Sequence, residues 1–486
     1  MNSSATNKKE LWTVRRCSPY ALAALCLTAL AGELLFASQT PVQSQTPSRP
    51  TSLTTPNPSG AARSVFLNGA AFDLRNPFFK SIGTNGRACA SCHVPADGWT
   101  ITPPHILARF NASRGMDPIF SAFDGTNSPH ADLSTLAARR AASSMLITKG
   151  LIRIGIAIPD TAEFTLDAVD DPYGYASSTE LSLFRRPLPT TNLRFLTGVM
   201  WDGRESTPLT QTMPISAKLS DADNLANLTA DLLHQGNSAT MGHARASRNL
   251  TTDEAQQVVD FETSLATAQL VDKNAGALNS DGATGGPANI ATDPFYVTIN
   301  DVLGADHFGI DFDSSSMTLF DAWKDSSNPH RAQIARGAVL FNTKVINITD
   351  VRGINDDLNL ATLKGTCTTC HDSPNIGNHS VALPLDLGLT DASRRTADMP
   401  LYTLKNKVTG DTIQTTDPGR ALISGRWKDI GRFKGPVLRG LAARAPYFHN
   451  GFAADLEAAV NFYDTRFDID FTDQEKADLV AFLKTL

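Results

Sequence analysis

Two copies of one pentapeptide pattern, Cys-x-x-Cys-His, constrain this chain more than any other feature. The first copy occupies positions 89–93 and the second positions 367–371 of 486 residues. In this pattern both cysteine thiols typically bond to a porphyrin, and the adjacent histidine binds the iron as proximal ligand. We therefore predict two covalently bound c-type haems. The attachment residues are Cys89, Cys92, Cys367 and Cys370, and the iron ligands are His93 and His371.

Zinc or a disulfide is the alternative interpretation of the paired cysteines. Four-thiolate zinc sites usually combine two Cys-x-x-Cys pairs that lie about 15–20 residues apart. Here more than half of the chain separates the two pairs, and a histidine follows each of them. Both observations favour haem. The two other cysteines, Cys17 and Cys26, lie near the N-terminus, so we expect no structural disulfide.

Residues 1–38 have the pattern of an export signal, because four basic side chains accompany a mostly apolar run. An N-terminal anchor, which would tether the protein to a membrane, is the alternative, and Glu33 inside the apolar run counts against it. Residues 39–62 are rich in Ser, Thr, Pro and Gln, which predicts a disordered linker. Together these features predict a protein of the periplasm.

The rest of the chain is predicted to be mainly α-helical, since few segments alternate as strands do. We divide it into an N-terminal haem domain over 63–330 and a C-terminal haem domain over 331–486. Long additions at about 110–178 and 270–325 have no predicted role. The formal net charge of −6 carries no sign of a nucleic-acid partner.

Each half is predicted to close with an amphipathic helix that packs on its haem. Both helices are expected to begin at a capping box, in which a threonine and a glutamate three residues later bond to each other's backbone N–H. Thr251 and Glu254 form this pattern in the first half, and Thr472 and Glu475 form it in the second.

Several further motifs carry a family resemblance. The segments 433–439, 445–451 and 456–460 follow the second haem motif, and 200–204 follows the first. Together with the haem motifs, these segments resemble the bacterial di-haem cytochrome c peroxidase/MauG family. The resemblance implies two cytochrome-c-like haem domains packed face to face. It also implies that the N-terminal haem meets peroxide and that the C-terminal haem handles electrons.

Tyr463 falls where this family has the second axial ligand of the C-terminal haem. Members that need prior reduction typically have Met at this position, and MauG-type members have Tyr. A thioether favours Fe(II), whereas a phenolate is a hard anion that favours higher oxidation states. We predict that Tyr463 binds the iron opposite His371. The alternative is that Tyr463 is a core aromatic residue beside Phe462.

The resemblance also implies residues around the peroxide. Trp201 matches a tryptophan placed between the haems, where an oxidisable indole relays electrons. Gln211 keeps the family spacing and is expected to hydrogen-bond bound peroxide. Pro214 arrives one residue earlier than the family pattern, so it is a weaker match.

The acid–base group that moves a proton between the peroxide oxygens has two candidates. Asp221 falls at the family's distal glutamate position, one methylene shorter. His243 is the second candidate, with Arg245 beside it to polarise the O–O bond. His105 and His130 follow the first haem motif, and we weigh His105 as a distal ligand of the resting haem.

The chain departs from the family at its calcium site. That site often uses an asparagine side chain and two backbone carbonyls, one at the proline matched by Pro446. The asparagine position is Arg186, next to Arg185, and Arg444 occupies the other carbonyl position. Guanidinium groups repel a divalent cation, so we predict that no Ca2+ is bound there.

We predict a periplasmic di-haem peroxidase that reduces H2O2 to water. Peroxide would react at the His93 haem, and the second oxidising equivalent would pass through Trp201 to be stored as Fe(IV) on the His371/Tyr463 haem. A small periplasmic cytochrome c or a cupredoxin would supply electrons. One alternative is MauG-like oxidation of a partner protein's side chains. A non-catalytic electron carrier is the other, which the tyrosine ligand disfavours.

Overall fold

The computed structural model describes residues 50–206, 220–381 and 383–486. Segment 1–38, the beginning of the predicted linker, Gln211 and Pro214 lie outside these residues. The stretch Arg49–Leu486 forms one compact unit. No helix of the described residues has the length and apolar character needed to span a bilayer.

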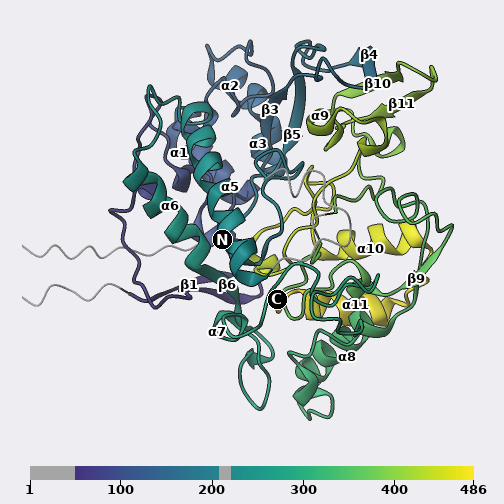
Figure 1. Ribbon diagram of the computed structural model, residues 1–486. Helices are drawn as coiled ribbons and strands as arrows, with labels where there is room; N and C mark the ends of the chain where they lie inside the picture. The colour runs from purple at the N-terminus through teal and green to yellow at the C-terminus, as the bar shows by residue number, and fades with distance from the viewer. Residues whose placement is uncertain (1–49, 207–219, 382) are drawn as a thin grey trace, which may run out of the picture. The chain divides into compact units, whose positions relative to one another are not determined.

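The described residues contain both helices and sheets (Figure 1). The helices are α1 (Pro103–Ser113), α2 (Leu136–Ala142), α3 (Ser144–Lys149), α5 (Asp221–Gly242), α6 (Thr252–Ser264), α7 (Pro287–Ile290), α8 (Pro329–Thr343), α9 (Ala421–Ser424), α10 (Leu456–Phe467) and α11 (Asp473–Leu483). The strands are β1 (Ser52–Asn57), β2 (Gly60–Phe66), β3 (Ile152–Ile156), β4 (Phe164–Asp170), β5 (Leu181–Arg185), β6 (Leu265–Asp272), β7 (Gly276–Ala277), β8 (Ile346–Ile348), β9 (Leu363–Gly365), β10 (Leu401–Asn406) and β11 (Thr412–Thr415). The prediction of a mainly α protein is therefore only partly confirmed, because strands make up a substantial part of the fold.

The N-terminal sheet corrects the predicted disordered linker over 39–62. Strands β1 and β2 form an antiparallel hairpin, and β2 pairs with β6 in a sheet of order β1-β2-β6-β7. The hairpin turns at Pro58 and Ser59, and β2 begins at Gly60, whose φ is 142° and where a Cβ would lie 2.0 Å from the Val271 carbonyl oxygen. The linker prediction is wrong from Ser52 onward. Its composition favoured disorder, but β1 pairs with the neighbouring β2, and β2 in turn pairs with β6, some two hundred residues later in sequence.

Both predicted closing helices begin as expected. The hydroxyl oxygen of Thr251 accepts a hydrogen bond from the backbone N–H of Glu254, and Thr472 and Glu475 repeat the arrangement. These bonds satisfy backbone donors that the first turn of a helix leaves free. The capping boxes are confirmed at α6 and α11.

The closing helix α6 packs on the first haem motif. Its buried residues Val258 and Phe261 belong to an aromatic cluster with Phe78 and Trp99, and Cys89 packs against this cluster. Phe78 and Phe261 approach with ring centroids 4.7 Å apart. This arrangement fixes the start of the haem motif between a helix and a sheet edge.

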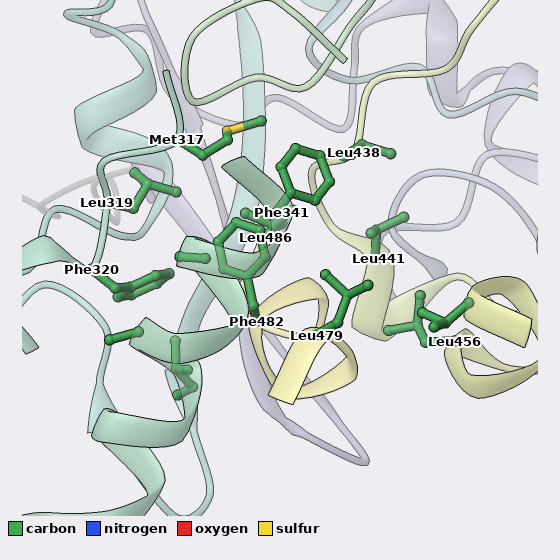
Figure 2. Packing of buried hydrophobic residues seen from close by; sticks show 14 of the residues in the cluster. Met317, Leu319, Phe320, Phe341, Leu438, Leu441, Leu456, Leu479, Phe482 and Leu486 are labelled. Atoms are coloured by element: carbon green, nitrogen blue, oxygen red, sulfur yellow. The ribbon is translucent and has the colours of Figure 1, made fainter. Parts of the chain in front are cut away.

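The closing helix α11 packs on α8 in the second half (Figure 2). The two helices approach closely at Gly337, where a Cβ would lie 2.0 Å from the Asp478 carbonyl oxygen. Phe341 of α8 and Phe482 of α11 lie in the same buried cluster, with ring centroids 5.5 Å apart. Cys367, Cys370 and Tyr463 pack against this cluster from its edge.

Strand pairing joins the two halves of the sequence. Strand β4 of the first half pairs antiparallel with β10 of the second, within a sheet of order β11-β10-β4, and the two lie side by side in Figure 1. Part of the long addition at 110–178 therefore completes a sheet with a later segment. The predicted boundary at 330–331 falls in the first turn of α8, and the division into two haem domains stays a prediction.

Candidate active site

The two Cys-x-x-Cys-His motifs have the same local geometry. The Nδ1 of His93 lies 3.1 Å from the carbonyl oxygen of Trp99, and the Nδ1 of His371 lies 2.8 Å from that of Gly377. A carbonyl only accepts hydrogen bonds, so each Nδ1 carries the proton and each Nε2 is left as the atom that can bind a metal. Burial lowers the pKa of both histidines to about 4, which keeps them neutral, as a metal ligand must be.

Each motif opens into its own cavity. The first cavity is lined by the 89–93 motif, by α5 and α6, and by the segment 185–193. Its empty volume, including the part open to solvent, is about 1710 Å³. The second cavity is lined by the 367–371 motif, α10 and α11, with about 1780 Å³. The two cavities share part of their lining. The shared residues are Arg186, Pro187, Pro189, Trp201, Lys434, Pro436 and Arg444.

The residues that line the cavities fit a covalently attached haem in each. All four motif cysteines are free thiols, and each pair lines its cavity together with its histidine. The guanidinium of Arg439 is buried beside the first cavity, and none of its three nitrogens has a partner among the described residues. An acidic ligand in the cavity would satisfy it. Among the described residues, no group of three or more His, Cys, Asp or Glu side chains is placed to hold a metal ion.

His243 supplies an imidazole to the first cavity from outside the haem motif. It follows directly after α5 and lines the cavity. Its Nδ1 lies 2.5 Å from a carboxylate oxygen of Asp124, which is 3% exposed. Asp124 is also paired with Arg87, whose other nitrogens donate to the carbonyl oxygens of Pro118 and Ile119 at 2.8 Å each. This buried chain of contacts fixes the ring through its Nδ1 side.

The carboxylate of Asp124 is held in its ionised form. Although burial works against ionisation, the hydrogen bond from His243 and the charges of His243 and Arg87 lower the pKa of Asp124. An ionised acceptor at Nδ1 favours the tautomer that keeps the Nδ1 proton. The Nε2 of His243 is therefore the nitrogen available to accept or donate a proton elsewhere.

The other acid–base candidate, Asp221, does not line either cavity. It stands at the start of α5, and its carboxylate accepts a hydrogen bond from Arg194 at 3.1 Å. Of the two candidates, His243 lines the first cavity and Asp221 does not. The family spacing pointed to Asp221 because it counted residues across the segment 207–219, which lies outside the described residues together with Gln211 and Pro214.

The remaining polar candidates also lie away from the cavity lining. The Nδ1 of His105 lies 2.5 Å from the buried carboxylate of Asp97, and half of its side chain is exposed. His130 packs edge-on against a tyrosine ring at 5.0 Å. The guanidinium of Arg245 lies over the Phe123 ring at 4.8 Å. His105, His130 and Arg245 therefore do not line the first cavity.

Trp201 lines both cavities, as its predicted place between the haems requires. The indole Nε1 donates to the carbonyl oxygen of Arg186 at 2.8 Å, and the ring packs edge-on against His449 at 6.1 Å. The backbone N–H of Lys434 donates to the Trp201 carbonyl oxygen at 2.8 Å. These contacts fix the indole in the wall that separates the two cavities.

Two adjacent buried arginines have opposite surroundings. Arg185 bonds the carboxylates of Asp417 and Asp202, which raise its pKa although burial works against its charge. The guanidinium of Arg186 donates only to carbonyl oxygens in the described residues, at 2.8 Å to Ile101 and 3.0 Å to Arg444 and to Lys149. Burial, followed by the charge of Arg444, lowers its pKa to about 10. Arg186 thus bonds the Arg444 carbonyl that the sequence analysis assigned to a calcium ligand.

A buried carboxyl group of the first cavity escaped the sequence analysis. Glu262 of α6 is 4% exposed and lines the cavity, and burial raises its pKa from 4.5 to about 8. It directly follows the buried Phe261, on a helix for which the sequence predicted an apolar face toward the haem. Only the position of Glu262 one turn after the buried Val258 signalled that it faces inward.

Proteins named as cytochrome c peroxidases are similar to part of this chain. It is 29% identical over 143 residues to a cytochrome-c peroxidase of Pseudomonas sp. (strain SCT), covering 25% of this chain and 37% of that protein. It is 30% identical over 142 residues to one of Denitromonas iodatirespirans, covering 27% and 38%. It is 31% identical over 121 residues to the cytochrome c551 peroxidase of Nitrosomonas europaea, covering 25% and 30%. The chain thus spans less than two fifths of each of these relatives.

The matched relatives are cytochrome c peroxidases, in keeping with the resemblance that the sequence motifs indicate. No family model matches this chain. Among solved structures, a MauG-like protein associated with microbial copper homeostasis aligns with 85% of this chain and 87% of its own, at 16% identity and a TM-score of 0.34.

Tyr463 is the residue predicted to occupy the ligand position that is methionine in other proteins of the resembled family. It projects from α10 and lines the second cavity with His371. It also packs against Phe462, with ring centroids 5.3 Å apart, as the alternative interpretation expected. Burial, followed by the charges of Cys370 and Cys367, raises the pKa of its phenol. Only a nearby cation would make the phenolate stable there, and ligation by Tyr463 stays a prediction.

Proposed function

We propose that the protein is a periplasmic di-haem peroxidase, which reduces H2O2 to water with electrons from a small cytochrome c or a cupredoxin. The observation that carries this proposal is His243, which shares the first cavity with His93 and is anchored by a buried carboxylate. A simple electron carrier needs no such acid–base group beside its iron. The periplasmic location rests on the signal-like segment 1–38 alone.

Two c-type haems would be held by the two cysteine pairs and by His93 and His371, and when bound they would supply the iron that binds peroxide and exchanges electrons. The chain contributes positioning and proton transfer. We further propose that no Ca2+ is bound between the haems, because Arg186 bonds the Arg444 carbonyl with its own guanidinium. Metal analysis that found one tightly held Ca2+ per chain would contradict this.

Proton transfer is assigned to His243. Breaking the O–O bond requires a proton to move from one peroxide oxygen to the other, so that water can leave. The Nε2 of His243 would accept this proton and return it, while Asp124 holds the Nδ1–H and stabilises the transient imidazolium. Each peroxide takes up two electrons and two protons in total and yields two waters.

Electron transfer between the cavities is assigned to Trp201. Its indole lies in the shared wall, and an oxidisable aromatic ring there shortens the distance that an electron must cross. The second oxidising equivalent would then be held on the side of His371 and Tyr463. A hard phenolate ligand would stabilise that oxidised side.

The same tyrosine favours a second candidate function, the MauG-like oxidation of a partner protein's side chains. Steady-state turnover separates the two. A peroxidase oxidises a reduced small cytochrome or cupredoxin over many cycles of added H2O2. A protein-modifying enzyme instead loses its oxidising equivalents slowly with these donors.

His243→Gln is the variant that tests the proposal. We expect the rate of reaction of the haem-loaded protein with H2O2 to fall by ~10²–10⁴-fold, as for loss of an acid–base group. His234→Gln is the matched control, because His234 lies on α5 and bonds the Glu205 carboxylate at 2.5 Å but is exposed and lines neither cavity. An unchanged rate in His243→Gln, or an equal loss in both variants, would contradict the assignment.

A further inference from the structure

Four basic side chains line the cavities where the two adjoin. Arg186, Lys434 and Arg444 line both cavities, and Arg439 lines the first. The three arginines are at most 9% exposed, and Lys434 is partly buried. We call these four residues the cationic wall. Its members come from two stretches of sequence far apart, so the fold has gathered the charges at one place.

Within the part of the chain that the structure describes, the cationic wall is without carboxylate partners. Among the described residues, none of the four forms an ion pair with Asp or Glu. The internal segment 207–219 contains no Asp or Glu in its sequence. Arg185 gives the contrast, since it is equally buried beside Arg186 and bonds two aspartates. Within the described residues, the fold thus pairs buried Arg185 with two carboxylates, whereas it gives the four cations of the cationic wall none.

Arg439 is the clearest case. It is 2% exposed, and its Nε, Nη1 and Nη2 all lack a partner among the described residues. Asp293 acts on it only through space, without an ion pair. Arg444 uses Nη2 to bond the Val437 carbonyl, but its Nε is without a partner. Buried charged groups are normally paired, so a missing anion is expected at these nitrogens.

Burial shifts the pKa of the same groups. It lowers the pKa of Arg439 and of Arg444 to about 10, and burial together with the charge of Arg444 lowers that of Lys434 to about 8. A cation whose pKa falls on burial is stabilised when an anion joins it. The groups therefore favour binding of an anion over an empty site.

We propose that the cationic wall binds the propionate carboxylates of both haems, with Arg439 holding a propionate of the His93 haem and the other three residues shared between the two haems. The inference rests on the proposed haem occupancy of both cavities, but not on peroxidase activity. A porphyrin carries two carboxylates, and a planar guanidinium with free nitrogens matches a carboxylate in a bidentate pair. Because three members line both cavities, carboxylates from either side would meet the same charges.

The charges of the cationic wall would also affect the reduction potentials of the haems. Positive charge beside a haem favours the reduced iron, whose net charge is lower by one unit. Arg439 would act on the His93 haem alone, whereas Lys434 and Arg444 would act on both. The shared charges would thus couple the two reduction potentials without any contact between the irons.

Arg439→Gln tests the inference through the reduction potentials of the haem-loaded protein. We expect the midpoint potential of the His93 haem to fall by 59 mV or more, a tenfold change in a one-electron equilibrium, with the His371 haem unchanged. Lys434→Gln should lower both potentials, and Arg439→Lys should recover part of the loss. Arg75→Gln is the matched control, because it removes one exposed positive charge paired with Asp73.

A second measurement uses the unaltered protein, in case the glutamine variants do not fold. Propionates that accept N–H bonds shift their bending frequencies in the resonance Raman spectrum when H2O is exchanged for D2O, and we expect this shift. Absence of the shift would overturn the inference, as would equal potentials in wild type and Arg439→Gln. A potential that follows the concentration of added inorganic phosphate would also overturn it, because a free anion would then occupy Arg439. A haem-loaded protein without peroxide turnover would refute the proposed function and leave these readouts valid.

Discussion

The two cavities begin from the same pentapeptide and differ in what faces it. In both, the proximal histidine is neutral and bonded through Nδ1 to a carbonyl six residues later. The first cavity then receives an imidazole from the end of α5, with a buried carboxylate behind it. The second receives a phenol from α10 within an apolar wall. The same motif thus faces a carboxylate-anchored imidazole in one cavity and a buried phenol in the other.

The second cavity has an ionisable pair of its own, but its position differs. His379 lines the cavity and its Nδ1 lies 3.3 Å from the carboxylate of Asp372. Asp372 follows His371 directly in sequence, so this pair belongs to the haem motif itself. His243 and Asp124 come from separate parts of the first half, independent of the motif. The comparison teaches that the difference between the cavities comes from the segments added around each motif.

The largest expected effect comes from replacing the tyrosine of the second cavity by methionine, the residue typical of peroxidases that need prior reduction. Tyr463→Met should raise the midpoint potential of the His371 haem by at least about 120 mV, a hundredfold change in a one-electron equilibrium, because a thioether favours Fe(II) over a phenolate. Spectroelectrochemical titration measures it. Tyr447→Phe is the control, since Tyr447 lines the same cavity but donates its hydroxyl to the Leu441 carbonyl. A potential unchanged in Tyr463→Met means that the tyrosine is a packed aromatic residue and that the two irons differ less than proposed.

The next effect tests the proton-transfer side of the comparison. Asp124→Asn should slow the reaction with H2O2 by ~10–100-fold, because the amide no longer fixes the Nδ1–H tautomer of His243. Stopped-flow rates between pH 5 and 9 measure it, and the pH profile should change along with the rate. Asp117→Asn is the control, since it removes a neighbouring arginine–aspartate pair, with Arg109, outside the cavity lining. A rate loss with an unchanged pH profile would reduce Asp124 to a purely structural role.

The smallest effect concerns stability and its dependence on pH. The raised pKa of Glu262 means that the folded protein keeps this carboxyl protonated while the unfolded chain ionises it, so stability falls as pH rises from 4.5 to about 8. Glu262→Gln does not titrate. Its free energy of unfolding should match wild type near pH 4 and exceed it by ~1–2 kcal/mol near pH 8, within a ceiling of ~5 kcal/mol set by 1.36 kcal/mol per pH unit. Denaturant titrations at the two pH values measure it.

Glu254 of the same helix supplies a control of opposite sign. The hydrogen bond from Arg248, with those of the capping box, lowers its pKa to about 2. Its stabilisation is therefore present above the ordinary carboxyl pKa and is lost as pH falls toward 2. Glu254→Gln should be less stable than wild type at pH 7 and converge with it in acid. If Glu262→Gln behaved in the same way, Glu262 would be ionised in the fold and the first cavity wetter than proposed.

Local patterns in the sequence determined the short-range features of this protein. The haem motifs, the neutral proximal histidines and the capping boxes of α6 and α11 depend on residues within a few positions of one another. Such short-range rules operate wherever the pattern occurs. The family motifs also singled out Trp201, which lines both cavities, and they predicted arginines where a calcium site was expected.

The tertiary structure decided the rest, because the deciding contacts join residues far apart in sequence. Asp124 meets His243 across 119 positions, and Arg186 meets the Arg444 carbonyl across 258. No pattern within either segment records such a contact. The same reason applies in part to the predicted linker, because β1 pairs with β2 and the distant strand β6 then holds β2 in the sheet. Sequence alone predicted the iron ligands and the haems, whereas only the fold placed His243, and not Asp221, in the lining of the first cavity and gathered the cationic wall.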